Sequence, residues 1–276
     1  MKTSFRRLVT VTVLTGSALV PCQAAVRNHQ TGSATNSDSS QIRSFTRLLS
    51  GNGWETTIVL MDMGSSPVSF RQSFLDNDGL PAPFNVNLQT TNMNLTTSAL
   101  QGEIAPYGTA TFTLVDDGSA LHEAWSLLTF DGAQNQLAGY AVVRHRASDG
   151  NLRFEATLPA GNLMDSSARM PFDNTQGFQT QLTVVNPASN LAAQVQLTYF
   201  NAAGQAILLD SLTLNPGQQT TLTLPNTYPD LADQTGTIAV LANINCLSVS
   251  GLRVNPATGA VTAVPVMDFT PSVTLQ

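Results

Sequence analysis

Residues that commonly bind metals or catalyse reactions are scarce in this chain, and their spacing matches no familiar motif. The 276 residues include three histidines, His29, His122 and His145. His122 adjoins Glu123, and neighbouring residues on a strand point to opposite faces of a sheet. His145 stands between two arginines, whose charge disfavours a bound cation. No H-x-H, H-E-x-x-H or C-x-x-C motif occurs, so we predict that the protein holds no metal and no cofactor.

Acidic side chains gather in short glycine-containing runs. The run 76–79 reads D-N-D-G, but a calcium loop needs alternate oxygen ligands and a downstream glutamate, and position 74 is Phe74. A later run at 201–204 reads N-A-A-G and keeps only the glycine. We interpret both runs as tight turns that require a positive φ, with a weak ion site at 76–79 as the alternative.

Nucleophilic catalysis has no recognisable arrangement either. The motif G-x-S-x-G is absent, and no Ser, His and Asp fall in an interpretable order on predicted elements. A carboxylate pair for glycoside cleavage is defined by its distance in space, which the sequence does not give. An enzyme of unrecognised type is therefore kept as one hypothesis, behind the two binding functions given below. We predict that the protein is not an enzyme.

Three aromatic residues are the candidate ligand contacts. Sugar recognition needs exposed aromatic faces. Trp54 and Phe178 occupy equivalent places in the two halves of the sequence, which favours a packing role for both. The aromatics found in the first half alone, which with an insert at 81–102 would form a binding platform, are Tyr107, Trp125 and Tyr140.

The sequence that would form the elements positioning these residues contains an internal repeat. Three stretches recur in the same order: 53–60 at 177–184, 104–114 at 214–224, and 139–142 at 251–254. A recurrence that keeps its order indicates a tandem structural unit. Apolar residues within it alternate, as Phe112 and Leu114 do, and this period of two predicts strands.

The alternation and the frequent turns predict an all-β protein of two tandem antiparallel β-sandwiches, immunoglobulin-like, with about seven strands each. We predict a signal peptide at 1–24, a disordered leader at 25–44, a first sandwich at 45–164 and a second at 170–270. Because only a short polar connection at 165–170 would join them, we expect a semi-rigid rod.

Composition narrows the class of partner. Charged residues make up 11% of the chain, against about 25% in typical soluble domains. The formal net charge is −6, and Lys2 is the sole lysine. Without a basic patch the sequence argues against binding to nucleic acid. The expected partner is therefore a protein or a glycan.

The first 24 residues have the layout of an export signal. Lys2 and two arginines precede the apolar stretch 8–20, which is too short to span a bilayer. Small residues then favour cleavage after Ala24, and no later stretch would span a membrane. Lipidation at Cys22 is the alternative, which Pro21 disfavours because a small residue normally precedes the lipidated cysteine.

Cleavage after Ala24 would remove Cys22 and leave Cys246 as the one cysteine of the mature chain. A single cysteine cannot form an internal bridge, so we expect the fold to depend on packing alone. Cys246 would share one face of a strand with Ile244 and Ser248, and it is predicted to be a small buried hydrophobe.

The recurring motifs also resemble those of a family. The residues that carry the resemblance are G-W-x-T at 53–56, V-V-N-P at 184–187 and L-x-P-G at 214–217. They are similar to uncharacterised secreted bacterial proteins with tandem immunoglobulin-like or fibronectin-type-III-like units. The likeness covers about 45–276 and departs at 61–63, where M-D-M replaces V-N-P. It implies strands and turns but no catalytic residues.

These observations predict an exported, non-enzymatic structural or interaction module, which is secreted, periplasmic or held at the outer cell surface. A carbohydrate-binding module that uses the first-half aromatics is the alternative.

Overall fold

The computed structural model describes residues 11–13, 41–89, 93–163 and 166–268. The predicted signal peptide apart from Val11–Val13, the candidate lipidation site Cys22, and most of the predicted leader lie outside the described residues. Regular structure within the described residues is almost entirely strand, which confirms the all-β prediction. The short helices are α1 (Leu224–Thr227) and the 3₁₀ turn η1 (Pro229–Leu231).

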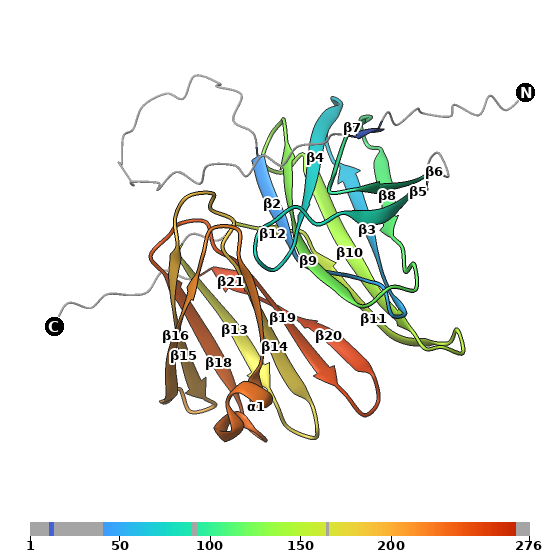
Figure 1. The fold of residues 1–276 in the computed structure, drawn as a ribbon. Coiled ribbons are helices and arrows are strands. Elements are labelled where there is room, and N and C mark those ends of the chain that lie inside the picture. Colours follow the sequence, from blue (N-terminus) through green and yellow to red (C-terminus); the bar gives the residue numbers. More distant parts are fainter. Residues whose placement is uncertain (1–10, 14–40, 90–92, 164–165, 269–276) are drawn as a thin grey trace, which may run out of the picture.

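Four antiparallel sheets make up the fold (Figure 1). Sheet 1 contains, in spatial order, β1 (Val11–Val13), β7 (Ala99–Ile104), β4 (Val68–Leu75), β9 (His122–Phe130), β2 (Gln41–Ser50) and β12 (Gly161–Asn162). Sheet 2 contains β11 (Leu152–Pro159), β10 (Leu137–Arg146), β3 (Trp54–Asp62), β8 (Thr109–Leu114), β5 (Phe84–Leu88) and β6 (Met93–Thr97).

The later half of the chain forms the other two sheets. Sheet 3 contains β16 (Ala206–Leu214), β15 (Ala193–Asn201), β18 (Thr235–Ala242), β13 (Ser167–Asp173) and β21 (Met267–Asp268). Sheet 4 contains β17 (Gln219–Thr223), β14 (Gln179–Val185), β19 (Ser248–Asn255) and β20 (Ala260–Val264).

Two large apolar clusters lie between paired sheets. The first joins sheets 1 and 2, where the ring of Phe74 lies 5.5 Å from that of Phe84 and 6.5 Å from that of Phe112. The second joins sheets 3 and 4, and includes Tyr199 and Leu182. Burial alternates along strands such as β3 because successive side chains point to opposite faces. Sheets 1 and 2 are the first sheet pair below, and sheets 3 and 4 the second.

The second sheet pair repeats the strand order of the first. The order β7-β4-β9-β2-β12 in sheet 1 corresponds to β16-β15-β18-β13-β21 in sheet 3. The order β11-β10-β3-β8 in sheet 2 corresponds to β20-β19-β14-β17 in sheet 4. Each correspondence keeps both chain order and pairing, so the recurrence of the sequence extends to the topology.

Both sheet pairs also contain a buried threonine at the equivalent position, Thr56 in the first and Thr180 in the second. Thr56 Oγ1 donates to the carbonyl of Leu49 at 2.8 Å and accepts from its N–H at 3.0 Å. Thr180 Oγ1 makes the same two bonds with Asp173, at 3.2 and 2.9 Å. Each threonine therefore holds the end of the preceding strand, seven residues earlier.

Several expectations need correction. The sheet pairs contain more strands than the seven predicted for each sandwich. β2 begins at Gln41, so the end of the predicted leader is strand, and Ser44 within it is buried. β13 begins at Ser167, inside the predicted polar connection. Both segments pair with a core strand, which satisfies backbone groups that a loop would leave open.

The predicted insert at 81–102 contains the hairpin β5–β6, which extends sheet 2 beyond β8. Its inward side chains Phe84, Val86 and Leu88 are buried in the first cluster. The insert therefore contributes side chains to the first core and also enlarges the outward face of sheet 2.

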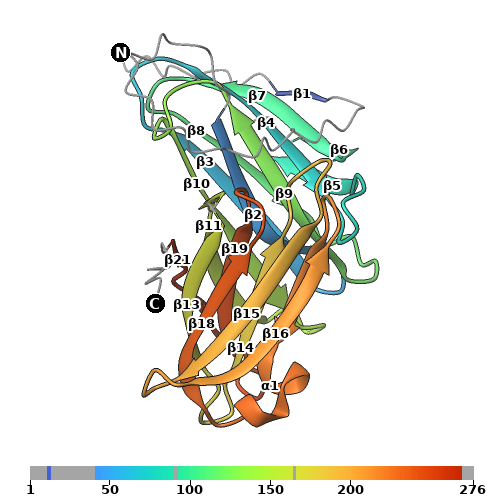
Figure 2. The same cartoon turned by 90° about the vertical axis from the view of Figure 1, so that its left-hand side faces the viewer.

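The two sheet pairs also pack on each other, which corrects the expected rod. Sheet 1 lies against sheet 4 (Figures 1 and 2). Beside this contact, β10 and β11 of sheet 2 pack on β19 and β20 of sheet 4. Val185 of β14 joins Leu75, Trp125 and Leu127 of sheet 1 in one buried cluster. We call this contact the seam.

Cys246 is buried in the second core, as expected, but it is disulfide-bonded. The expectation of a fold without a bridge applies to the chain cleaved after Ala24, whereas this disulfide belongs to the full 276-residue chain. The only other cysteine of the sequence, Cys22, lies outside the described residues.

Candidate functional site

Trp125, a predicted ligand contact, lies inside the seam. Its side chain has no exposed surface, and its Nε1 donates to the carbonyl oxygen of Gly217 at 3.0 Å. The side chain points away from the first core because Ala124 of the same strand points into it. Trp125 therefore offers no face to a ligand in this structure.

The other two predicted contacts lie apart from Trp125. Tyr107 is 71% exposed at the turn between β7 and β8, with a φ of 56°. Tyr140 is half-buried on β10, opposite Val59 of β3, on the outward face of sheet 2. The structure does not bring the three aromatics together on one platform.

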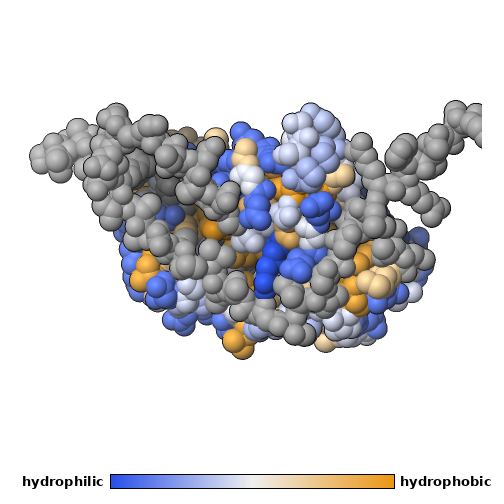
Figure 3. Space-filling model, turned by 90° about the horizontal axis from the view of Figure 1, so that it is seen from above, coloured by the Kyte–Doolittle hydropathy of each residue, from blue (hydrophilic) through white to orange (hydrophobic). Residues whose placement is uncertain are grey.

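The outward face of sheet 2 carries amides and hydroxyls over β8 and the added hairpin, whereas Glu55 of β3 forms an ion pair with Arg144 of β10 at 3.9 Å. Side-chain hydrogen bonds run across these strands, joining Asn87 to Asn94 at 2.7 Å, Thr96 to Asn85 at 2.6 Å and Thr57 to Thr113 at 3.0 Å. The hairpin thus widens the face that also carries Tyr140. Viewed from above the molecule, the surface not covered by grey atoms has hydrophilic and hydrophobic areas intermingled (Figure 3).

Polar contacts hold the seam in register. Arg47 of β2 forms an ion pair with Glu123 of β9 at 3.1 Å and donates to Gln181 of β14 at 2.5 Å. Ser44 is bonded to Ser248 across the same interface. These directional bonds specify one arrangement of the sheet pairs, since any slip would leave partly buried polar groups unpaired.

Two glycines let the backbones meet at the seam. A Cβ on Gly79 would lie 2.7 Å from the Cα of Gly217, and both residues have a positive φ. Nearby, the N–H of Gln219 donates to the carbonyl of Asn77 at 2.9 Å. Gly79 therefore serves this contact as well as the turn predicted from the sequence.

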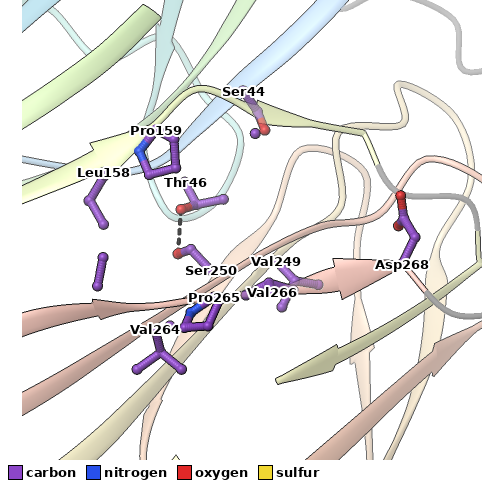
Figure 4. A pocket seen from close by; sticks show the side chains of 13 residues that line it. Ser44, Thr46, Leu158, Pro159, Val249, Ser250, Val264, Pro265, Val266 and Asp268 are labelled. Atoms are coloured by element: carbon purple, nitrogen blue, oxygen red, sulfur yellow. Dashed lines mark hydrogen bonds between the residues drawn. The ribbon is translucent and has the colours of Figure 1, made fainter. Parts of the chain in front are cut away.

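One cavity opens at the seam, where the terminal strands of the four sheets approach one another (Figure 4). Its volume is about 430 Å³. The residues that line it come from β2, β11, β12, β19 and β20 and from the segment that leads into β21. We call this cavity the seam cleft. The cleft is not evident in the sequence, because its lining is assembled from four separate stretches of the chain.

The acidic runs behave as turns. Asp76 Oδ1 accepts from the N–H groups of Asp78 and Leu80 at 2.9 and 2.8 Å. Asn201 Oδ1 accepts from Ala203 and Gln205, both at 3.0 Å. The neutral amide oxygen of Asn201 accepts the same pair of backbone hydrogen bonds as the carboxylate of Asp76. Turn formation therefore explains the residues of both runs. Within the described part of the chain, no group of three or more His, Cys, Asp or Glu could hold a metal.

The two described histidines are used in ring packing. His122 stacks on Phe84 with centroids 4.4 Å apart, and His145 stacks on Trp54 at 4.6 Å. Neither histidine lies in the seam cleft.

Comparison with known proteins gives no identification. No family model matches the sequence, and no curated protein matches it either. Among the described residues, no helix has the length and apolar character needed to cross a bilayer.

Proposed function

We propose that the protein is an exported, non-enzymatic interaction module built from two tandem immunoglobulin-like sandwiches that act as one body. The seam is the observation that carries this proposal. Sheet 1 buries its second face, including Trp125, against sheet 4. A module whose parts are locked in this way presents several surfaces to a partner at a constant spacing.

The chemistry of the described residues fits this proposal. Histidines stack on aromatic rings, and the acidic runs form turns. The partner is expected to be a protein or a glycan at the cell surface, and the apolar stretch at 8–20 supports export. The open edges of sheets 1 and 3 offer further contact surface.

Carbohydrate binding is the alternative, and one observation favours it. The hairpin β5–β6 extends the same sheet face that carries Tyr140, and it adds amides and hydroxyls to that face. Such groups can bond to sugar hydroxyls while the tyrosine ring packs on a sugar face.

A glycan array and a pull-down from envelope extracts separate the two hypotheses. Deleting the whole insert is a poor test because Phe84 and Val86 would leave the core. We would instead compare Tyr140→Ala with Tyr107→Ala, an exposed tyrosine outside this face. Glycan binding that Tyr140→Ala abolishes and Tyr107→Ala retains would establish the alternative. Capture of a protein without any glycan signal would support the interaction module, whereas neither signal would contradict both.

A further inference from the structure

The walls of the seam cleft are aliphatic. Leu158 of β11 packs in one cluster with Ala263 of β20, while Val249, Val264 and Val266 line the cleft where it adjoins the second core (Figure 4). Among the described residues that line the cleft, none is aromatic and none is basic. Such walls gain free energy by covering apolar surface, and a volume of about 430 Å³ falls within the usual range of small-molecule sites.

Hydroxyl groups supply the polar part of the cleft. Thr46 Oγ1 donates to Ser250 Oγ at 2.5 Å. A serine hydroxyl that accepts one bond still has its own proton to donate. Ser250 therefore provides a donor for an oxygen acceptor on a bound molecule.

Charge at the cleft disfavours an anion. Asp268, an exposed residue, stands at the rim, and the chain carries a net charge of −6. An anionic ligand would gain no basic partner in the lining to offset the loss of its hydration. The cleft consequently suits an uncharged molecule.

Two prolines argue against an added strand as the occupant. Pro159 ends β11 and Pro265 follows β20, and both line the cleft. Proline has no N–H to donate to a neighbouring strand. The cleft edges are thus unsuited to main-chain pairing, and an occupant must bind through its apolar surface.

We propose that the seam cleft is a binding site for a neutral, largely apolar small molecule that carries one oxygen acceptor. The apolar part lies against the walls contributed by β11, β19 and β20, and the acceptor bonds to Ser250. This site is independent of the partner surfaces proposed above, because its lining includes neither Tyr140 nor the hairpin β5–β6.

Two fluorescent probes with the same naphthalene core test the proposal on the full chain. Prodan is neutral and has a ketone oxygen, whereas 1-anilinonaphthalene-8-sulfonate is an anion. We expect saturable, one-to-one binding of Prodan with a blue-shifted emission, and at least tenfold weaker binding of the anion. Absence of Prodan binding, or equal binding of both probes, would overturn the proposal.

Matched variants locate the probe. Ala263→Phe places a ring at the half-buried cleft wall, while Ala260→Phe alters an exposed position on the same strand. We expect Ala263→Phe to weaken Prodan binding at least tenfold and Ala260→Phe to leave it unchanged. Equal binding by the two variants would place the probe elsewhere and refute the site.

The variant Ser250→Ala tests the same site with a smaller change, in case Ala263→Phe does not fold. Ser250→Ala should weaken Prodan binding roughly threefold to tenfold, the effect of one lost hydrogen bond, and shift the bound emission further to the blue. Ser248→Ala removes a seam hydroxyl that does not line the cleft. If both variants gave the same affinity and emission, the assigned hydrogen bond would be wrong.

Discussion

At equivalent places, where β3 and β14 end, the chain buries two polar side chains that differ in their hydrogen bonds. Asn186 donates to the carbonyls of Leu191, Leu214 and Asn215 at 2.7 to 3.1 Å. Asp62 is equally buried, yet its Oδ2 has no hydrogen-bond partner in the described structure. The sequence difference at 61–63, which weakened the family resemblance, is thus a substitution within one conserved geometry.

Exchanging these two residues tests that interpretation. Asp62→Asn replaces an unpartnered buried oxygen by a donor, so we expect the free energy of unfolding to rise by about 1 kcal/mol. The reverse change, Asn186→Asp, removes the donors to three carbonyls and should cost about 3 kcal/mol. Urea denaturation measures both. A destabilising Asp62→Asn would show that the two positions are not equivalent.

Two tyrosines give the second residue-scale prediction. Burial raises the pKa of Tyr228 to about 12, and the hydrogen bond that it donates to Asp210 acts in the same direction. Burial raises the pKa of Tyr199 as well. Because the folded state favours the protonated phenols, their contribution to stability is complete below pH 10, the pKa of an unfolded tyrosine.

We therefore expect the free energy of unfolding to fall as the pH rises from about 10 to about 12. Tyr228→Phe should make this fall shallower, since one of the two titrating groups is then absent. Denaturation curves at pH 8, 10 and 11 supply the measurement. An unchanged slope in Tyr228→Phe would exclude the tyrosine as its source.

At the scale of elements, the buried threonines indicate how each sheet pair is closed. Thr56→Val and Thr180→Val keep the side-chain shape but remove the partner of an N–H and a C=O of the preceding strand, which are buried at Leu49 and partly buried at Asp173. We expect each change to cost about 2 kcal/mol. Thr57→Val, an outward-facing control next to Thr56, should cost less than about 1 kcal/mol. Unequal costs for the two buried threonines would argue against equivalent sheet pairs.

Much of this element-scale organisation was predictable from sequence. The recurrence of 53–60 at 177–184 predicted β3 and β14, and glycine predicted the turns. The recurrence does not predict the hairpin β5–β6, because the second half of the chain has no counterpart of the insert. The start of β13 is not evident from the sequence, because the segment 165–170 has the composition of a polar connection, yet Ser167, Ala168 and Met170 are buried once it pairs with β18.

The seam could have been partly anticipated. Along β9 the run A-W-S-L-L-T-F is apolar at nearly every position, a pattern typical of a strand that is buried on both faces. Trp125 was instead treated as a surface residue because the second half of the chain has no counterpart. The seam cleft was not predictable, since no local motif joins Ser44, Leu158, Val249 and Val264.

At the scale of the whole molecule, export makes a defined chemical prediction. Cleavage after Ala24 would give a secreted chain that begins at Ala25 and lacks Cys22. Mass spectrometry of the secreted protein, before and after thiol alkylation, determines its first residue and the state of Cys246. A retained N-terminal peptide in which Cys22 is linked to Cys246 would contradict cleavage at this position.

The central physical claim is that the seam makes the two sheet pairs one rigid body. Trp125 is the natural residue to disturb, because its ring fills the interface and its Nε1 reaches Gly217. We expect Trp125→Ala to cost about 3–5 kcal/mol, as for other buried large-to-small changes. The variant provides a control in which the sheet pairs are free to reorient.

Residual dipolar couplings of backbone amides in a weakly aligned sample test this claim most directly. The account predicts that couplings from β2–β12 and from β13–β21 fit a single alignment tensor in the unaltered chain, and that Trp125→Ala separates them. Two tensors of different magnitude in the unaltered chain would contradict it.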